Sequence, residues 1–189
     1  MAKPNLDNRG QFLVLCTLAP FALPIIGTLL LVLLVGNHFP RDIAPGSGLK
    51  LMGLIAAVLA GAGVLAIVCR RWSDPQARRL ALVLCGVTTL MAWPVWTVGV
   101  LPSVNGMALA ESEVTAMRLT GLEVTHASKS RELYYWASLA SPIADTRLGA
   151  GRYFISRELH ARWSVTRAQT VQVKHATGLL GAEVVRDYR

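Results

Sequence analysis

The sequence predicts an α + β protein in which three transmembrane helices are followed by a small extramembrane antiparallel β-rich domain. Three observations predict this class. Hydrophobic residues make up 53% of the 189 residues and charged residues only 16%, whereas soluble domains usually carry about 25% charge. Long apolar runs fill the first half of the chain, and apolar and polar residues alternate in the second. This composition excludes a soluble globular protein and a disordered chain.

The apolar runs are residues 12–35, 49–68 and 80–101, and their only Asp, Glu, Lys, Arg or His is Lys50 at the edge of the second. A helix of about 20 such residues crosses the hydrocarbon core, where backbone groups must be paired within the segment. We therefore expect a transmembrane domain over residues 1–101 with three helical spans. The first run is longer than the apolar core of a signal peptide, so it is expected to be a retained anchor.

Positive charges predict the orientation of these spans. Lys and Arg near span ends prefer the cytoplasmic side, and the loop between the second and third runs carries four arginines. We therefore expect a multi-pass protein of the bacterial inner (plasma) membrane, with a cytoplasmic N-terminus and residues 102–189 in the periplasm or otherwise outside the cytoplasm. The arginines are interpreted as topology determinants that can also bind anionic lipid head groups. They are Arg70, Arg71, Arg78 and Arg79.

Local signals refine the three helices. Asp74 is a favoured N-cap and Pro75 suits the first helical position, so the third helix is expected to begin there. Pro94 lies inside the same helix and should kink it. The second helix has a stripe of small residues, which favours packing on the other two spans or, alternatively, on a second copy or a partner subunit. The stripe consists of Gly53, Ala57 and Gly61.

The absence of ionisable groups from the interior of the runs argues against several functions. Ion and proton pathways and many transporter sites need such groups at membrane depth. A transporter, pump or channel acting alone is therefore not expected, although an accessory subunit of one remains an alternative. Cys16, Cys69 and Cys85 all lie in or beside the runs, so no disulfide is expected in the C-terminal domain.

Four stretches of the C-terminal half alternate as strands do, and the valine pair at 184–185 suggests a last short strand. Together they predict a small antiparallel sheet or sandwich. One of them, residues 152–163, also places Ile155, Leu159 and Trp163 at helical spacing, so a helix is the alternative there. Loops are expected at residues 127–130 and 141–151, and a linker or short helix before the first strand. The five stretches are residues 119–125, 132–139, 152–163, 170–174 and 184–185.

The search for chemistry in this domain finds no catalytic, cofactor-binding or metal-ligating set. His126, His160 and His175 are far apart in sequence and lack metal-site spacing. The best binding candidates are Tyr134 and Trp136, because exposed aromatic side chains often anchor protein partners, while the residue between them is expected to point into the core.

We therefore expect a non-enzymatic, membrane-anchored interaction or accessory subunit with an extracytoplasmic binding module, such as a component of an envelope complex or an immunity-type protein. Its partners would be membrane lipid and a protein or a second copy. Nucleic acid is not expected, because much of the net charge of +8 comes from the arginine loop. One alternative is a membrane-associated enzyme that uses Arg157, Glu158 or His160, and another is an accessory subunit of a transporter.

Overall fold

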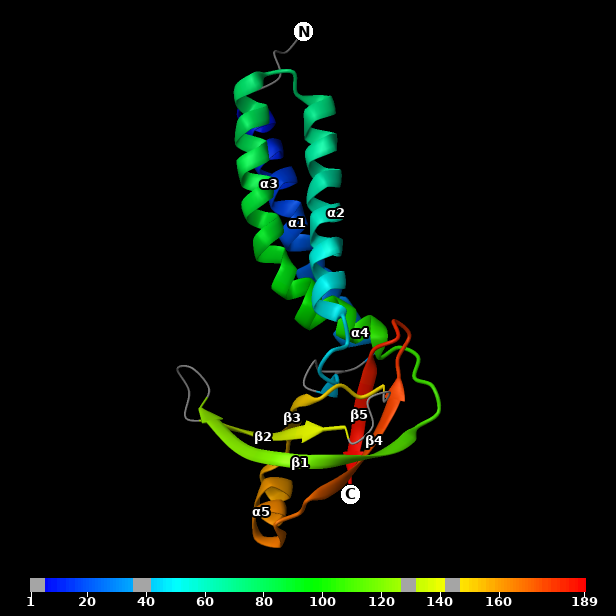
Figure 1. Ribbon diagram of the computed structural model, residues 1–189. Coiled ribbons are helices and arrows are strands. Elements are labelled where there is room, and N and C mark those ends of the chain that lie inside the picture. The colour runs from blue at the N-terminus through cyan, green and yellow to red at the C-terminus, as the bar shows by residue number, and fades with distance from the viewer. Residues whose placement is uncertain (1–5, 36–41, 127–131, 142–146) are drawn as a thin grey trace. The chain divides into compact units, whose positions relative to one another are not determined.

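The computed structural model describes residues 6–35, 42–126, 132–141 and 147–189 (Figure 1). The loop predicted at residues 127–130, and residues 142–146 of the loop predicted at 141–151, lie outside this range. The first half of the chain forms the helices α1 (Leu6–Val35), α2 (Leu49–Arg71) and α3 (Pro75–Val95). The first two helices each contain one of the apolar runs, and the third run continues beyond α3 in a helical stretch that reaches Asn105. All three helical stretches are long and apolar enough to cross a membrane, so the prediction of three long apolar helices is confirmed.

The helices bury small and polar groups between them and expose large apolar side chains. Leu33 is 81% exposed and Leu59 is 67% exposed. In contrast, Thr17 and Thr88 are buried, and the Thr88 hydroxyl donates a hydrogen bond to the Thr17 carbonyl at 3.0 Å, which joins α3 to α1. This arrangement is the one expected where lipid, rather than water, surrounds the helices, because close packing and interhelical hydrogen bonds then hold helices together.

The third helix begins as predicted. The Asp74 carboxylate accepts the backbone N–H groups of Gln76 and Ala77, both at 3.2 Å, and Pro75 is the first helical residue. These bonds satisfy donors that have no partner within the helix. The N-cap prediction is therefore confirmed.

The region after Pro94 forms a wide helical turn. The helix continues as a π-helical turn, η2 (Trp96–Val100), and then as α4 (Leu101–Asn105). The N–H of Leu101 donates to the carbonyl of Trp96, five residues back. Since Pro94 has no N–H to donate, the ladder is interrupted beside it, and insertion of a π turn is one way for a helix to continue past such a break.

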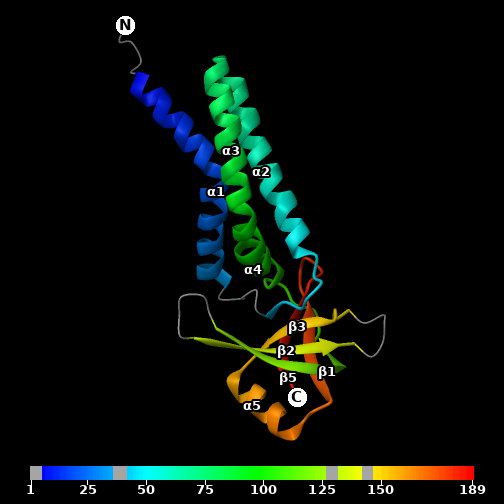
Figure 2. The same ribbon diagram turned by 60° about the vertical axis from the view of Figure 1, so that its left-hand side comes forward.

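The second half of the chain forms a curled, five-stranded antiparallel sheet in the order β3-β2-β1-β4-β5 (Figure 2). Each stretch with predicted alternation contributes to a strand, so the antiparallel β-rich fold is confirmed. A hydrogen bond at 3.0 Å from the Tyr188 hydroxyl to the Phe154 carbonyl links the two ends of the sheet. The strands are β1 (Glu113–His126), β2 (Leu133–Ala140), β3 (Gly151–Ile155), β4 (Thr170–Thr177) and β5 (Glu183–Tyr188).

Residues 152–163 form both of the predicted alternatives in succession. Strand β3 ends at Ile155, Ser156 caps the next helix by accepting the N–H of Leu159 at 3.2 Å, and α5 (Arg157–Thr166) follows. The strand prediction is thus wrong beyond Ser156. The helical spacing prevails there because Trp163 and Leu159 pack on the core from α5, while the capping serine satisfies a donor of the first turn.

The sequence allows a linker or a short helix before β1, the helix over residues 107–113. The structure forms no helix there. Leu109 instead makes an isolated antiparallel bridge to Gly178, and the helical stretch ends earlier, at Asn105. The segment is therefore fixed by pairing with a distant turn, which no local pattern reveals.

The core lies on one face of the sheet, under α5. A register shift between Leu119 and Gly121 changes which residues of β1 face the core, from Met117 before it to Leu122 after it. Such a bulge adds one residue and increases the local twist, which fits the curl of the sheet. The buried core residues are Ala44, Met117, Ala137, Leu139, Leu148, Tyr153, Ile155, Trp163, Val171, Val173 and Val185.

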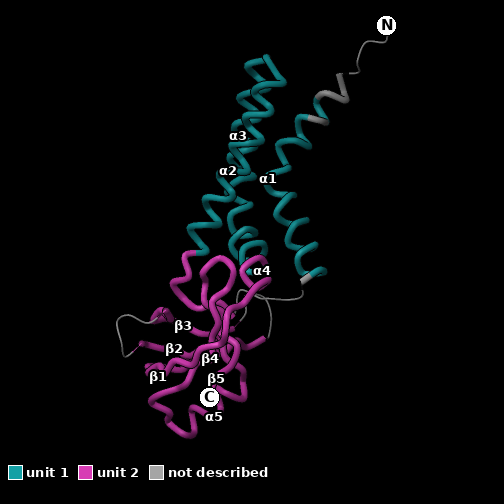
Figure 3. The backbone as a smooth tube through the Cα atoms, turned by 90° about the vertical axis from the view of Figure 1, so that its right-hand side faces the viewer, with its two compact units in different colours: residues 1–37, 49–103 teal, residues 38–48, 104–189 magenta. Residues whose placement is uncertain are grey.

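Part of the connection between α1 and α2 belongs to the β-rich unit. The chain divides into two compact units, residues 1–37 with 49–103 and residues 38–48 with 104–189 (Figure 3). Ile43 bridges Val184 on β5, and the N–H of Ala44 donates to the Glu183 carbonyl at 2.9 Å. The second unit is therefore built from two separate stretches of sequence, although the sequence suggested a division near residue 102.

Candidate functional site

The predicted binding residues Tyr134 and Trp136 lie on the face of the sheet opposite the core. Both are partly exposed, and both make edge-to-face contacts with Phe154 of β3, with ring centroids 6.2 Å and 5.6 Å apart respectively. The Trp136 indole N–H donates to the Thr125 hydroxyl at 2.8 Å. Tyr135 points the other way and packs against the core. We call Tyr134, Trp136 and Phe154 the aromatic face.

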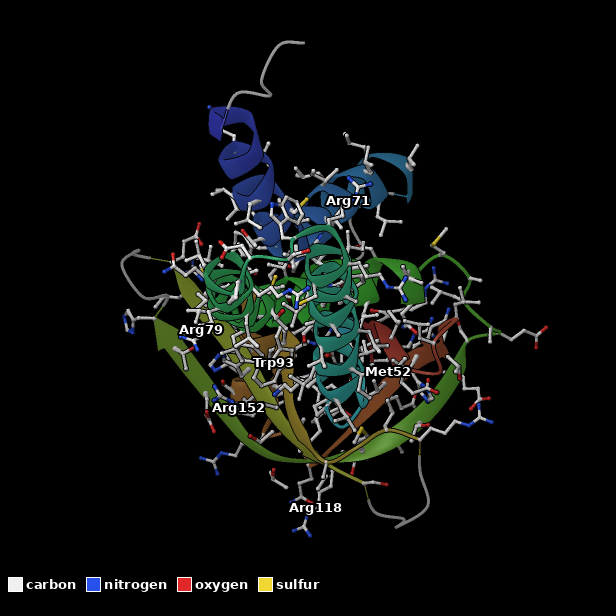
Figure 4. All side chains as sticks on the ribbon, turned by 90° about the horizontal axis from the view of Figure 1, so that it is seen from above. Met52, Arg71, Arg79, Trp93, Arg118 and Arg152 are labelled. Atoms are coloured by element: carbon white, nitrogen blue, oxygen red, sulfur yellow. The ribbon has the colours of Figure 1, made fainter. Side chains whose placement is uncertain are left out.

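Charged side chains border the aromatic face. The Arg152 guanidinium lies 5.1 Å from the centroid of the Trp136 ring and pairs with Glu123 at 3.2 Å. Arg118, on the same side of the sheet, points away from it (Figure 4). The rings are therefore held in fixed positions with a cation above one of them, so a ligand would meet a surface that is already ordered.

The most complete polar network of the described chain lies at the other end of the sheet. His175 and Glu183 are 2% and 5% exposed, and the imidazole Nδ1 lies 2.7 Å from Glu183 Oε2. The other ring nitrogen lies 2.9 Å from the Thr115 hydroxyl. If the carboxylate holds the proton on Nδ1, Nε2 accepts the hydroxyl proton. The order hydroxyl, imidazole, carboxylate is that of a nucleophile, a base and its orienting group.

This network continues to the surface beside a cavity of about 620 Å³. The Thr177 hydroxyl donates to Glu183 Oε1 at 2.7 Å. Arg147, an exposed side chain, lies 3.4 Å from both the Thr177 hydroxyl and Glu113 Oε1. Glu183, Thr177 and Arg147 line the cavity, whereas Thr115 does not. The network therefore satisfies every buried polar group it contains, as a structural role requires.

Sequence reasoning missed this network. The sequence favours a structural or surface role for His175 over metal binding, but it does not indicate Glu183 as its partner. A signal was present for His175, which continues the inward parity of Val171 and Val173, and a buried polar group needs a partner. Their pairing depends on the antiparallel arrangement of β4 and β5, which the sequence does not specify.

The predicted arginines lie at the junction of α2 and α3, and all four are exposed. Arg78 has a specific role, because its guanidinium donates to the carbonyls of Trp72 at 2.7 Å and Cys69 at 3.1 Å. These carbonyls lie at and just beyond the end of α2, where the helix leaves acceptors unpaired. Arg78 therefore closes the C-terminal end of α2, a role that charge counting did not indicate. Arg70, Arg71 and Arg79 complete the cluster.

The small-residue stripe of α2 is buried within the helical unit. Gly53, Ala57 and Gly61 are all buried. A Cβ added at Gly53 would collide with Thr97, and one added at Gly61 would collide with Thr89. The stripe thus packs on the third helix and on η2, so these residues face a neighbour within the chain.

The residues of the enzyme alternative lie on a helix. Arg157, Glu158 and His160 lie on α5 and not on one face of a strand. The His160 ring packs against Tyr135, with centroids 5.2 Å apart. Within residues that the structure describes, no group of three or more His, Cys, Asp or Glu side chains is arranged to hold a metal ion.

Two tyrosines of the β-rich unit, one buried (Tyr153) and one partly buried (Tyr188), connect separate segments of the chain. The Tyr153 hydroxyl donates to the Gly149 carbonyl at 2.6 Å, and burial raises the pKa of Tyr153 to about 12. The pKa of Tyr188 is also raised, first by burial and then by the nearby Tyr153 and Asp42.

Comparison of the chain with protein-family models, curated proteins and solved structures finds no match.

Proposed function

We propose that this chain is a non-enzymatic protein of the bacterial inner membrane whose extracytoplasmic β-rich unit binds a protein partner through the aromatic face. In this proposal the three long helices span the membrane, with the N-terminus and the arginine loop in the cytoplasm. The length and apolar surface of the helices support insertion. The placement of Arg70, Arg71, Arg78 and Arg79 supports the orientation, because positive charge is retained on the cytoplasmic side.

The observation that carries the binding proposal is the composition and order of the aromatic face. Tyr, Trp and Arg are the residue types most enriched where protein interfaces gain their affinity, and Tyr134, Trp136 and Arg152 bring all three together. Edge-to-face contacts with Phe154 fix the rings before binding. Less side-chain entropy is then lost when a partner binds. The helix α5 packs on the opposite face of the sheet, where the core lies.

A photo-crosslinking experiment in cells tests this proposal. The photoreactive amino acid p-benzoylphenylalanine would replace Tyr134, and Gln172, an exposed residue of β4, would carry it as the matched control. We expect one discrete protein adduct from position 134 and none from 172. Crosslinking only to lipid, or equally from both positions, would contradict the proposal, and an adduct with a second copy would identify the partner as this protein itself.

Binding by the identified partner then tests the individual side chains. Truncating a residue at the centre of an interface costs about 2 kcal/mol or more, which corresponds to roughly 30-fold in Kd. We expect that loss for Trp136→Ala in the purified full-length chain. Gln172→Ala should bind as the unmodified chain does.

A second candidate function is catalysis at the Thr115 hydroxyl, favoured by its 2.9 Å contact with His175 and the 2.7 Å contact of His175 with Glu183. Such a hydroxyl would react with a fluorophosphonate probe. Labelling that persists in Thr115→Ser and is lost in Thr115→Val would favour this function over the binding module. Absence of labelling of the folded chain would argue against it.

A further inference from the structure

The turn between β4 and β5 is fastened to the last residue of α4. Asn105 is completely buried. Its side-chain amide donates to the Ala182 carbonyl at 3.0 Å, and its side-chain oxygen accepts the N–H of Leu180 at 3.0 Å. The Asn105 carbonyl accepts the N–H of Leu179, also at 3.0 Å. The turn cannot leave Asn105 without breaking these bonds, each of which would leave a buried polar group unpaired.

Glycines make this close contact possible. A Cβ added at Gly178 would collide with the Asn105 side chain and with its carbonyl oxygen. Gly181 adopts a φ of 78°, in the left-handed region that side chains disfavour. These two glycines therefore allow the turn to pack closely against Asn105.

Two large apolar side chains beside Asn105 are exposed. Leu179, at the tip of the turn, is 59% exposed, and Met107, two residues after Asn105, is 52% exposed. The turn backbone is bonded to Asn105, and Met107 donates its N–H to the Val104 carbonyl at 3.2 Å. Both residues are therefore held close to Asn105. The third helical stretch that is long and apolar enough to cross a membrane, Pro75–Asn105, ends at this residue.

The expected depth of Asn105 indicates what covers these side chains. The third apolar run ends at Leu101, and a rise of 1.5 Å per residue places Asn105 about 6 Å beyond that point. The head-group layer on each side of the hydrocarbon core is about 5–8 Å thick. Asn105 and the turn bonded to it would then lie within this layer, where apolar side chains can reach lipid.

We propose that Leu179 and Met107 insert into the lipid interface, so that the β4–β5 turn anchors the β-rich unit to the bilayer surface. The inference rests on the membrane insertion included in the proposed function and adds a lipid contact to it. The hydrogen bonds of Asn105 keep the turn at the end of the span. Removing the two apolar side chains from water then stabilises this contact. The aromatic face remains the surface proposed to bind the protein partner.

Site-directed spin labelling tests this contact. Cys16, Cys69 and Cys85 would first be replaced by serine or alanine, and single cysteines introduced by Leu179→Cys and Met107→Cys as two independent reporters. Val165, which is 84% exposed on α5, would be replaced in the same way as a matched control from the same unit. Leu59, exposed on α2, would report on the span. The spin label is then examined in phosphatidylethanolamine–phosphatidylglycerol nanodiscs.

The measurement compares collisions of each spin label with oxygen, which is concentrated in lipid, and with a nickel chelate, which stays in water. We expect the ratio of oxygen to nickel collisions to be several-fold higher at 179 and 107 than at 165. Water-like values at 179 and 107 with a lipid-like value at 59 would overturn this inference alone. A lipid-like value at 165 would overturn the specific role of the turn. Water-like values at every position would overturn membrane insertion and, with it, this inference.

Discussion

Replacing His175 with alanine tests how much the buried pair stabilises the β-rich unit. The imidazole lies 2.7 Å from Glu183, and the two side chains are only 2% and 6% exposed. In His175→Ala the carboxylate keeps the Thr177 hydroxyl at 2.7 Å but loses the partner on its other oxygen. Breaking a buried pair by removing one partner costs about 3–5 kcal/mol, against a total stability of about 5–15 kcal/mol for a domain.

Thermal unfolding of the full chain in detergent, followed by near-ultraviolet circular dichroism, measures this loss. A loss of about 3 kcal/mol should lower the Tm of a unit of this size by more than about 10 °C. Glu183→Gln keeps an acceptor for His175 and places an amide donor, in place of the acceptor Oε1, beside the Thr177 hydroxyl, so we expect a smaller decrease. Gln172→Ala, at an exposed position of β4, is the control. If His175→Ala lowered Tm no more than Gln172→Ala does, the reasoning would be refuted.

Three further predictions concern packing, titration and capping. Gly61→Leu should lower the Tm of the helical unit by overpacking against Thr89, at a cost of about 1–3 kcal/mol, whereas Gly63→Leu, whose added Cβ meets nothing within 4 Å, should not. Since the pKa of Tyr153 rises to about 12 on folding, its contribution is complete below pH 10 and is lost as pH rises from 10 through 12; absorbance at 295 nm should show one late-ionising tyrosine disappear in Tyr153→Phe. Asp74→Ala should cost about 1 kcal/mol and speed hydrogen exchange in the first turn of α3, and unchanged exchange would argue against the cap.

The helical half could be predicted almost completely from sequence. Uninterrupted apolar runs allow only a helix in lipid, and the start of α3 follows from Asp74 and Pro75, whose effects are local. The π-helical turn after Pro94 could not be predicted, because a break in the ladder can be accommodated by a kink, a bulge or a neighbouring group, and packing decides among them.

The β-rich half was predicted in class but not in detail. Alternation located the strands, since it depends only on which face is buried. At residues 152–163 the alternation typical of a strand overlaps with the spacing typical of a helix, so the sequence did not decide between the two. The structure forms β3 and then α5, from which Trp163 packs on the core. The face of the sheet that carries Tyr134 and Trp136 also followed from alternation, since both side chains lie opposite Tyr135.

By itself, the sequence determined which segments are apolar enough to leave water, which residues of a strand share a face and where capped helices begin, because these properties depend on neighbours along the chain. The tertiary structure alone decided that His175 meets Glu183 and Thr115, that residues 42–44 join β5, and that Asn105 holds the turn after β4. Each of these contacts joins residues that alternation or helical spacing cannot relate. They arise from strand order, register and the curl of the sheet, which many distant contacts set together.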